Sequence, residues 1–212
     1  MEERNITVTL NKAKEWFNSG NATLKEIALQ AFDKDEFTYN FKNITTFKKA
    51  CEALDFDYGD MACMARKIAT ISRASAAMFK LNIIRRALNL CQDLHLTKDP
   101  KGSCIYYPYN PFITKSSTYY DSKIISGKME VIGKIKSEGE EYNVLGGYAF
   151  VSGNAGLYSY YGMGNADTNI GFLGCANEEI AKHFGKYFGM LITEAKYGDI
   201  VDFEVIQEKY KI

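Results

Sequence analysis

The uneven distribution of glycine, tyrosine and proline is the feature of this chain that most constrains its fold. Fifteen of the 17 glycines and 13 of the 15 tyrosines lie after Lys101, and the three prolines stand at positions 100, 108 and 111. The first half carries most of the helical patterns, whereas the second half is rich in residues that favour turns and strands. We therefore predict an α+β protein with a helical region over residues 1–98 and a glycine- and tyrosine-rich α+β region over residues 102–212. Because the joint at residues 97–102 is short, the two regions are expected to pack together.

Apolar residues in the first half recur with the three- and four-residue spacing that marks one face of a helix. The stripes are Leu24, Ile27, Ala28 and Ala31; Phe47, Ala50, Cys51 and Leu54; Met61, Met64, Ala65, Ile68 and Ile71; and Ala77, Leu81, Ile84 and Leu88. The pattern Thr23-x-x-Glu26 is typical of a capping box at a helix start, and Thr45, Thr46 and Asp60 are further cap candidates. With a short helix over residues 12–18, we predict an N-terminal bundle of four or five helices.

The second half shows the alternation of apolar and polar residues that is typical of strands. Residues 128–136 alternate, and residues 141–151 are predicted to pair back on them across a short loop in which Gly139 supplies the positive φ of a hairpin turn. Asn177 is predicted to cap a helix that runs to about Lys196, with two glutamates in its first turn. The remaining strand candidates are residues 157–161, 169–173 and 200–206. These elements predict an antiparallel β-sheet that carries one long helix.

Charge and hydropathy argue against two classes of partner. Lysine plus arginine and aspartate plus glutamate both total 26, so the chain has no net charge, whereas a dedicated nucleic-acid-binding protein needs a basic excess. No apolar run approaches the ~20 residues of a membrane span, and the charged start Met1–Arg4 leads into no apolar segment of a signal peptide. The five cysteines are scattered without a CxxC pair, which favours free thiols in a reducing compartment. We expect neither a nucleic-acid partner nor a membrane partner.

Cys175 and His183 are the candidate nucleophile and base, since a catalytic thiol needs a base within hydrogen-bond reach. If Asn177 begins a helix, more than two helical turns separate the pair, which is too far for a direct hydrogen bond. Cys175 is flanked by small residues, and His183 stands beside Phe184. Both are therefore predicted to be packing residues, and an enzyme that uses this pair is kept as an alternative.

The sequence offers little to a metal or a cofactor. Zinc sites need cysteines and histidines in short paired spacings, which the chain lacks. Asn165, Asp167 and Asn169 provide alternate oxygen ligands that suit a calcium ion, although without the glycine and glutamate of an EF-hand loop, and turn formation is the competing explanation. Gly162 and Gly164 do not have the spacing of a dinucleotide fingerprint. We predict no catalytic residue, no metal and no cofactor.

The segment from Gly146 to Cys175 is rich in glycine, tyrosine, asparagine and serine. These residue types dominate antibody binding loops, because tyrosine offers rigid contact area while the small polar residues adapt their hydrogen bonds. The predicted recognition surface, within residues 153–169, consists of Asn154, Tyr158, Tyr160, Tyr161, Asn165, Asp167 and Asn169. A glycine-rich sheet whose tyrosines pack on that sheet is the competing explanation, because dense tyrosines serve core and recognition alike.

Three blocks of the sequence resemble an uncharacterised family that is widespread in gut Bacteroidales genomes and in their phages and integrated elements. The blocks are residues 22–32 (ATLKEIALQAF), residues 78–89 (MFKLNIIRRALN) with Tyr106–Tyr109 after them, and residues 171–188 (GFLGCANEEIAKHFGKYF). The resemblance spans most of the chain and implies a phage- or mobile-element-associated protein, and it transfers no catalytic residue.

A second, weaker similarity relates residues 146–172 to the closing region of C-type-lectin-like domains. In those domains a Gly-Gly pair precedes a variable loop, and a Gly-Phe-Arg strand follows it. Here Gly146 and Gly147 supply the pair, Tyr148 replaces the following tryptophan, and Leu173 replaces the arginine. The similarity implies a diversified binding loop in this region.

We therefore expect a non-enzymatic, phage- or mobile-element-associated binding protein with a protein or glycan partner, located in the cytoplasm of a bacterial host or on a virion. The alternative is a phage structural or accessory subunit that forms a homo-oligomer, since a chain without net charge associates readily and tyrosine-rich surfaces suit interfaces. The second alternative is a small enzyme that uses Cys175 and His183. The sequence leaves the ligand and the oligomeric state open.

Overall fold

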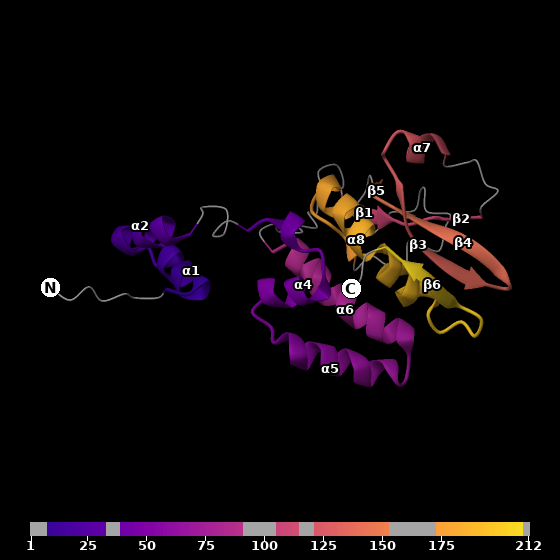
Figure 1. The fold of residues 1–212 in the computed structure, drawn as a ribbon, viewed down its shortest axis with the longest axis horizontal. Coiled ribbons are helices and arrows are strands. Elements are labelled where there is room, and N and C mark those ends of the chain that lie inside the picture. Colours follow the sequence, from indigo (N-terminus) through magenta and orange to yellow (C-terminus); the bar gives the residue numbers. More distant parts are fainter. Residues whose placement is uncertain (1–7, 33–38, 91–104, 115–120, 153–172, 210–212) are drawn as a thin grey trace. The chain divides into compact units, whose positions relative to one another are not determined.

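The chain forms two compact units, Met1–Asn40 and Phe41–Ile212. The computed structural model describes residues 8–32, 39–90, 105–114, 121–152 and 173–209. The fold is α+β, as predicted, with helices and antiparallel sheets (Figure 1). The predicted joint at residues 97–102 and the predicted strand at 157–161 lie outside the described residues.

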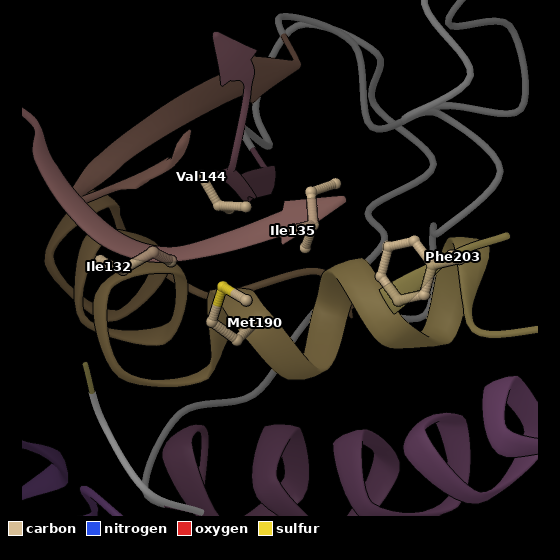
Figure 2. Packing of buried hydrophobic residues seen from close by; sticks show 5 residues of the cluster. All are labelled: Ile132, Ile135, Val144, Met190 and Phe203. Atoms are coloured by element: carbon tan, nitrogen blue, oxygen red, sulfur yellow. The ribbon is translucent and has the colours of Figure 1, made fainter. Parts of the chain in front are cut away.

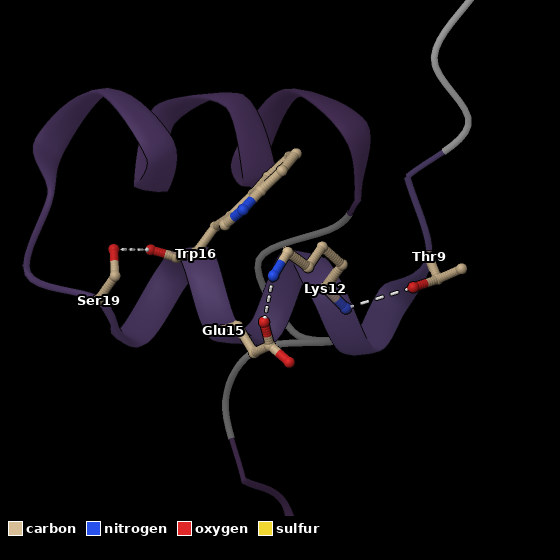
Figure 3. A network of polar contacts seen from close by, with 5 residues as sticks. All are labelled: Thr9, Lys12, Glu15, Trp16 and Ser19. Atoms are coloured by element: carbon tan, nitrogen blue, oxygen red, sulfur yellow. Dashed lines mark hydrogen bonds and ion pairs between the residues drawn. The ribbon is translucent and has the colours of Figure 1, made fainter.

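The first unit contains two short helices, α1 (Leu10–Asn18) and α2 (Ala22–Ala31). The Thr9 hydroxyl caps α1 by accepting a hydrogen bond from the Lys12 amide at 3.3 Å (Figure 3). The Lys12 ammonium pairs with Glu15 at 2.6 Å, and Ser19 Oγ donates to the Trp16 carbonyl at 2.8 Å. Side-chain groups therefore satisfy backbone atoms at both ends of α1, as helix ends require.

The start of α2 differs from the prediction. Asn21, rather than Thr23, is the cap: Asn21 Oδ1 accepts from the amides of Thr23 and Leu24 at 3.0 and 3.2 Å. One asparagine oxygen thus satisfies two free N–H groups, which fixes the helix start at Ala22. Thr23 consequently lies inside the first turn, and the predicted capping box is not formed.

The second unit holds the other described helices and strands. Its helices are the 3₁₀ turn η1 (Phe41–Asn43), α4 (Phe47–Ala53), α5 (Tyr58–Ala69), α6 (Arg73–Leu88), α7 (Asp121–Ile125) and α8 (Glu178–Tyr197). Its strands are β1 (Ile105–Tyr109), β2 (Phe112–Thr114), β3 (Glu130–Ser137), β4 (Glu140–Gly146), β5 (Tyr148–Ser152) and β6 (Glu204–Glu208). Strands β1 and β5 form a two-stranded sheet, and the order β2-β4-β3-β6 forms a four-stranded one. Both sheets are antiparallel, as predicted.

The predicted hairpin at the Ser137–Glu140 loop is confirmed. Strands β3 and β4 pair up to Ser137 opposite Glu140, and the two turn residues, Glu138 and Gly139, have φ of 51° and 80°. Two positive φ values in a two-residue loop match the twist of the flanking strands. The predicted long strand over residues 141–151 is instead divided at Gly147, where φ is 93°. The chain there leaves the four-stranded sheet and enters the two-stranded one.

Helix α8 is the central element of the second unit. It packs against α6 and against strands β1, β3, β4 and β5. Figure 2 shows this helix with strands on one side and the purple helices of the second unit on the other. Its Met190 belongs to a buried apolar cluster with Ile132, Ile135, Val144 and Phe203 (Figure 2). The helix predicted from Asn177 to about Lys196 is therefore confirmed, and it is buried on more than one side.

Two glycines let α8 approach the strands closely. A Cβ atom at Gly189 would lie 2.3 Å from Asn110 Nδ2 and from Ile132 Cδ1, and one at Gly185 would lie 3.2 Å from Pro108 Cβ. The buried Asn110 side chain fills the space that remains, because its Nδ2 donates to the carbonyls of Leu145 and Gly185, both at 2.9 Å. Asn110 thus joins α8 to β4.

Helix α5 begins earlier than predicted, and its predicted apolar stripe is buried in part. Its cap is Asp57, whose Oδ1 accepts from the Asp60 amide at 2.8 Å, so the predicted cap Asp60 lies in the first turn. Of the predicted apolar stripe, Ala65 is buried, whereas Met64 is 47% exposed and Ile71 is 90% exposed. Met61 and Ile68 of the same stripe are half-buried, so the predicted face does turn inward, although Met64 is left uncovered.

The last strand begins later than predicted, because residues 199–202 have other partners. Asp199 Oδ2 accepts from Ser72 Oγ at 2.5 Å, and its Oδ1 accepts from the Ala74 amide at 3.2 Å at the start of α6. Asp202 Oδ1 accepts from Ser137 Oγ at 3.3 Å beside the β3–β4 turn. Residues 199–202 are held by these contacts, and the pairing of β6 with β3 begins at Glu204.

Candidate functional site

The residues predicted as a recognition surface lie outside the described part of the chain. They are Asn154, Tyr158, Tyr160, Tyr161, Asn165, Asp167 and Asn169, all within residues 153–172. The structure does describe the residues on either side of this segment, up to Ser152 and from Leu173 onward. Their contacts show where the segment is attached to the fold.

Both ends of the 153–172 segment lie beside strand β1. On one side β5 pairs with β1, and Ser152 stands opposite Ile105. On the other side Cys175 forms an antiparallel bridge with Tyr106, with N–H···O distances of 2.8 and 3.2 Å. Because neighbouring strands lie about 4.8 Å apart, Ser152 and Cys175 are about 10 Å apart across β1. Strand β5 and the bridge at Cys175 both run antiparallel to β1, so the 20-residue segment leaves beside Ile105 and re-enters the described fold on the opposite side of β1.

Asn89, just after α6, holds the C-terminal end of this segment. Its Oδ1 accepts from the Ala176 amide at 2.9 Å, and its Nδ2 donates to the Arg85 carbonyl at 2.9 Å and more weakly to the Gly174 carbonyl at 3.5 Å. Only 8% of Asn89 is exposed. We call Asn89 and residues 174–176 the Asn89 clamp. Sequence reasoning missed it, since an asparagine after a helix is also typical of an ordinary helix end.

The Asn89 clamp continues directly into α8. Asn177 Oδ1 accepts from the Ile180 amide at 2.9 Å, which confirms the predicted cap. Glu178 and Glu179 lie in the first turn, where the helix dipole favours negative charge. The end of the 153–172 segment is therefore fixed by β1, α6 and α8 together.

The Cys175 thiol is buried inside this clamp. Burial raises the pKa of Cys175 to about 12, and the Arg85 guanidinium and the Asn89 side chain oppose this shift only in part. The thiol Sγ contacts the Leu173 carbonyl at 3.4 Å. At neutral pH the group stays protonated, and the protonated thiol is a poor nucleophile. The position suits a small packing residue.

His183 has a different set of neighbours, at η1 and the loop after it. Its Nε2 donates to the Ile44 carbonyl at 2.7 Å, and its ring lies 5.6 Å from the Phe41 ring and 4.6 Å from the Tyr187 ring. Burial lowers the pKa of His183, and Lys186 and Lys42 lower it further, while the bond to Ile44 opposes them. The neutral imidazole therefore ties η1 to α8, and its bonded nitrogen is engaged away from Cys175.

A cavity of about 270 Å³ opens between α5 and α6. Its apolar lining is mostly alanine, and its charged lining comprises Arg66, Arg73, Lys80 and Glu194. We call it the α5–α6 cavity. Sequence reasoning missed it because alanines within a helical stripe indicate a packed interface and give no sign of the space left between two such faces.

Other features of the described residues limit the kinds of site present. No group of three or more histidine, cysteine, aspartate or glutamate side chains is placed there to hold a metal ion. None of the helices found in the described ranges has the length and apolar character needed to cross a membrane.

No known protein family, no curated protein and no solved structure matches the chain. The resemblances noted from the sequence therefore stay predictions, and the function has to be argued from the chain's own residues.

Proposed function

We propose that the chain is a non-enzymatic binding protein that recognises a protein or glycan partner through the segment of residues 153–169. The observation that carries the proposal is that β1 anchors both flanks of the segment, with Ser152 paired to Ile105 on one side and Cys175 bridged to Tyr106 on the other. Loops that carry binding residues are commonly held in this way by a rigid scaffold. The composition of the segment supports the same role, because tyrosine and asparagine dominate adaptable recognition loops.

The chemistry of the scaffold supports binding better than catalysis. The thiol of Cys175 is buried and stays protonated near neutral pH, and the Nε2–H of His183 is bonded to a backbone carbonyl. Each residue joins secondary-structure elements of the scaffold. A binding role uses these contacts as they stand, whereas catalysis by this pair would require both to be broken.

The test compares two alanine variants of the segment with the wild type. Tyr160→Ala and Asp167→Ala are examined for binding to an array of bacterial polysaccharides and to proteins crosslinked in a bacterial lysate. Ile125→Ala is the control, because Ile125 is an exposed apolar residue on α7. If Tyr160 is a binding hot spot, its loss weakens binding by about tenfold or more. The melting temperature should change by less than about 2 °C, because exposed contact residues contribute little to the fold.

Two results would contradict this proposal. A partner whose binding is equally strong for Tyr160→Ala and for the wild type would place recognition elsewhere. A melting temperature that falls by several degrees in Tyr160→Ala would show that the tyrosine packs against the sheet, since a unit of this size loses about 2–4 °C per kcal/mol.

A second candidate function, assembly with further copies of the chain, is favoured by an exposed aliphatic patch. Ile71 and Val201 are almost fully exposed, and the bonds of Asp199 to Ser72 and Ala74 hold their two loops together. Such a patch suits a contact between proteins. Sedimentation velocity of the wild type and of Val201→Asp tests this candidate. A concentration-dependent oligomer that Val201→Asp dissociates would support it, and a wild-type monomer at all concentrations would rule it out.

A further inference from the structure

The α5–α6 cavity exists because the facing sides of two helices carry alanine. The five alanines that line it are Ala62, Ala65, Ala69, Ala76 and Ala77. Helices in contact normally fill the space between them with interdigitating side chains. An alanine has no atom beyond Cβ, and the long apolar side chain of Met64 is 47% exposed instead of turning inward. A partly open hollow of about 270 Å³ is left between the helices, close to the size range of small-molecule sites.

The charged residues that line the cavity are mostly cations. Arg66 comes from α5, and Arg73 and Lys80 come from α6, whereas Glu194 of α8 is the one carboxylate among the lining residues. Within the described ranges none of the three cations has a carboxylate oxygen within salt-bridge distance. The Arg73 Nη2 donates to the Phe203 carbonyl at 3.2 Å, which leaves the other donors of that guanidinium for a ligand. The lining therefore carries an excess of two positive charges.

Two of the three lining cations, Arg73 and Lys80, interact electrostatically with nearby carboxylates. Arg73 and its amide contribute to lowering the pKa of Asp199, behind the larger effect of the Ser72 hydroxyl. Partial burial and Glu194 raise the pKa of Glu208, and Lys80 opposes that rise. Among the described residues no carboxylate lies within salt-bridge distance of Arg66, so its guanidinium can bind an anion from solution.

The cavity has two chemically different ends along α5. Arg66 stands near the end of α5, and Arg73 is the first residue of α6, so both lie close to the turn between the helices. At the other end the lining is aromatic, with the Phe47 and Tyr58 rings 6.0 Å apart. From Tyr58 to Arg66 is eight residues of helix, which is about 12 Å.

We propose that the α5–α6 cavity binds a medium-chain carboxylate, with the carboxylate group at Arg66 and Arg73 and the aliphatic chain along the alanines toward Phe47 and Tyr58. The apolar chain fills a space that the alanines leave empty, and the carboxylate meets the cationic excess of the lining. An arginine pair suits this group because a guanidinium can bind a carboxylate through two parallel hydrogen bonds. No residue of the 153–172 segment lines this site. The carboxylate-binding proposal can therefore be refuted without refuting the proposed recognition function, and the reverse is also true.

The experiment is calorimetric titration of the full chain at low ionic strength with decanoate and, separately, with decanol, which has the same chain and no charge. Decanoate is expected to bind at least about fivefold more tightly than decanol, because charge-assisted hydrogen bonds are the stronger kind. Arg66→Gln should weaken decanoate binding about three- to tenfold and leave decanol unchanged. Lys67→Gln is the matched control, since Lys67 is the next residue of α5, also exposed, and does not line the cavity.

A second variant tests the cavity itself. Ala69→Leu places a larger side chain in the lining, and because Ala69 is exposed the change should not prevent folding, which its melting curve verifies. It is expected to weaken both decanoate and decanol. The proposal is overturned if decanoate does not bind, if decanoate and decanol bind equally, if Arg66→Gln and Lys67→Gln behave alike, or if folded Ala69→Leu binds as the wild type does.

Discussion

The contact between α8 and the sheets leads to a sharp prediction for Gly189→Ala. The added Cβ would lie 2.3 Å from Asn110 Nδ2 and from Ile132 Cδ1, where ordinary contacts begin near 3.4 Å, so each neighbour would have to move by about 1 Å. Asn110 is held by hydrogen bonds to Leu145 and Gly185, and Ile132 is completely buried. Overpacking a core costs about 1–3 kcal/mol, and weakening one Asn110 bond adds about 1 kcal/mol.

Against this cost, a glycine-to-alanine change inside a helix gains about 1 kcal/mol. The net loss for Gly189→Ala is therefore about 1–3 kcal/mol, and the melting temperature should fall by about 2–12 °C. Thermal and urea unfolding followed by circular dichroism measure it. Gly185→Ala is the milder comparison variant, because its added Cβ would lie 3.2 Å from the nearest atom, Pro108 Cβ. It should therefore destabilise the protein less than Gly189→Ala or not at all. A Gly189→Ala protein as stable as the wild type, or less affected than Gly185→Ala, would refute the close approach of α8 to Asn110.

Three further predictions concern the scaffold. Because the folded pKa of His183 is lowered, stability should be full above the unfolded value of about 6.5 and fall as the pH drops below it, and His183→Gln should remove that part of the pH dependence. Asn89→Ala leaves the Ala176 amide without its acceptor, so unfolding measurements should show a loss of about 1–3 kcal/mol, and the same loss in Asn82→Ala would contradict the clamp. Cys175 should be alkylated at pH 7 at least about a hundredfold more slowly than the half-buried Cys63, and faster labelling of Cys175 in mass spectrometry would reopen the enzyme hypothesis.

Local chemistry made several elements of the fold predictable. The Asn177 cap, the Ser137–Glu140 hairpin and the stripe ending in Leu88 each depend on residues close together in the sequence, and the structure has all three. A cap or a two-residue turn is decided by the few backbone groups that one side chain or one glycine can satisfy. Such elements can be read without knowing what packs against them.

Elements that depend on distant residues were predicted less well. The start of β6 is set by Asp199 and Asp202, whose partners lie in the α5–α6 turn and the β3–β4 turn. Within the predicted stripe of α5, Ala65 is buried whereas Met64 and Ile71 are exposed, although these two longer side chains are the more hydrophobic. Hydrophobic periodicity says which residues could face a partner, and the partner's shape decides which of them do.

The same distinction applies to the sites. Tyrosine and asparagine in residues 153–169 were visible as a composition, but the reason to expect a presented loop is the position of Ser152 and Cys175 on opposite sides of β1. The flank at Cys175 is held by Asn89, which is 85 and 87 residues away from Gly174 and Ala176 and has no motif of its own. A recognition segment needs its ends fixed before its side chains can be placed at low entropic cost. Burial of Asn89 and the raised pKa of Cys175 both follow from the enclosure of residues 174–176 between β1 and the end of α6.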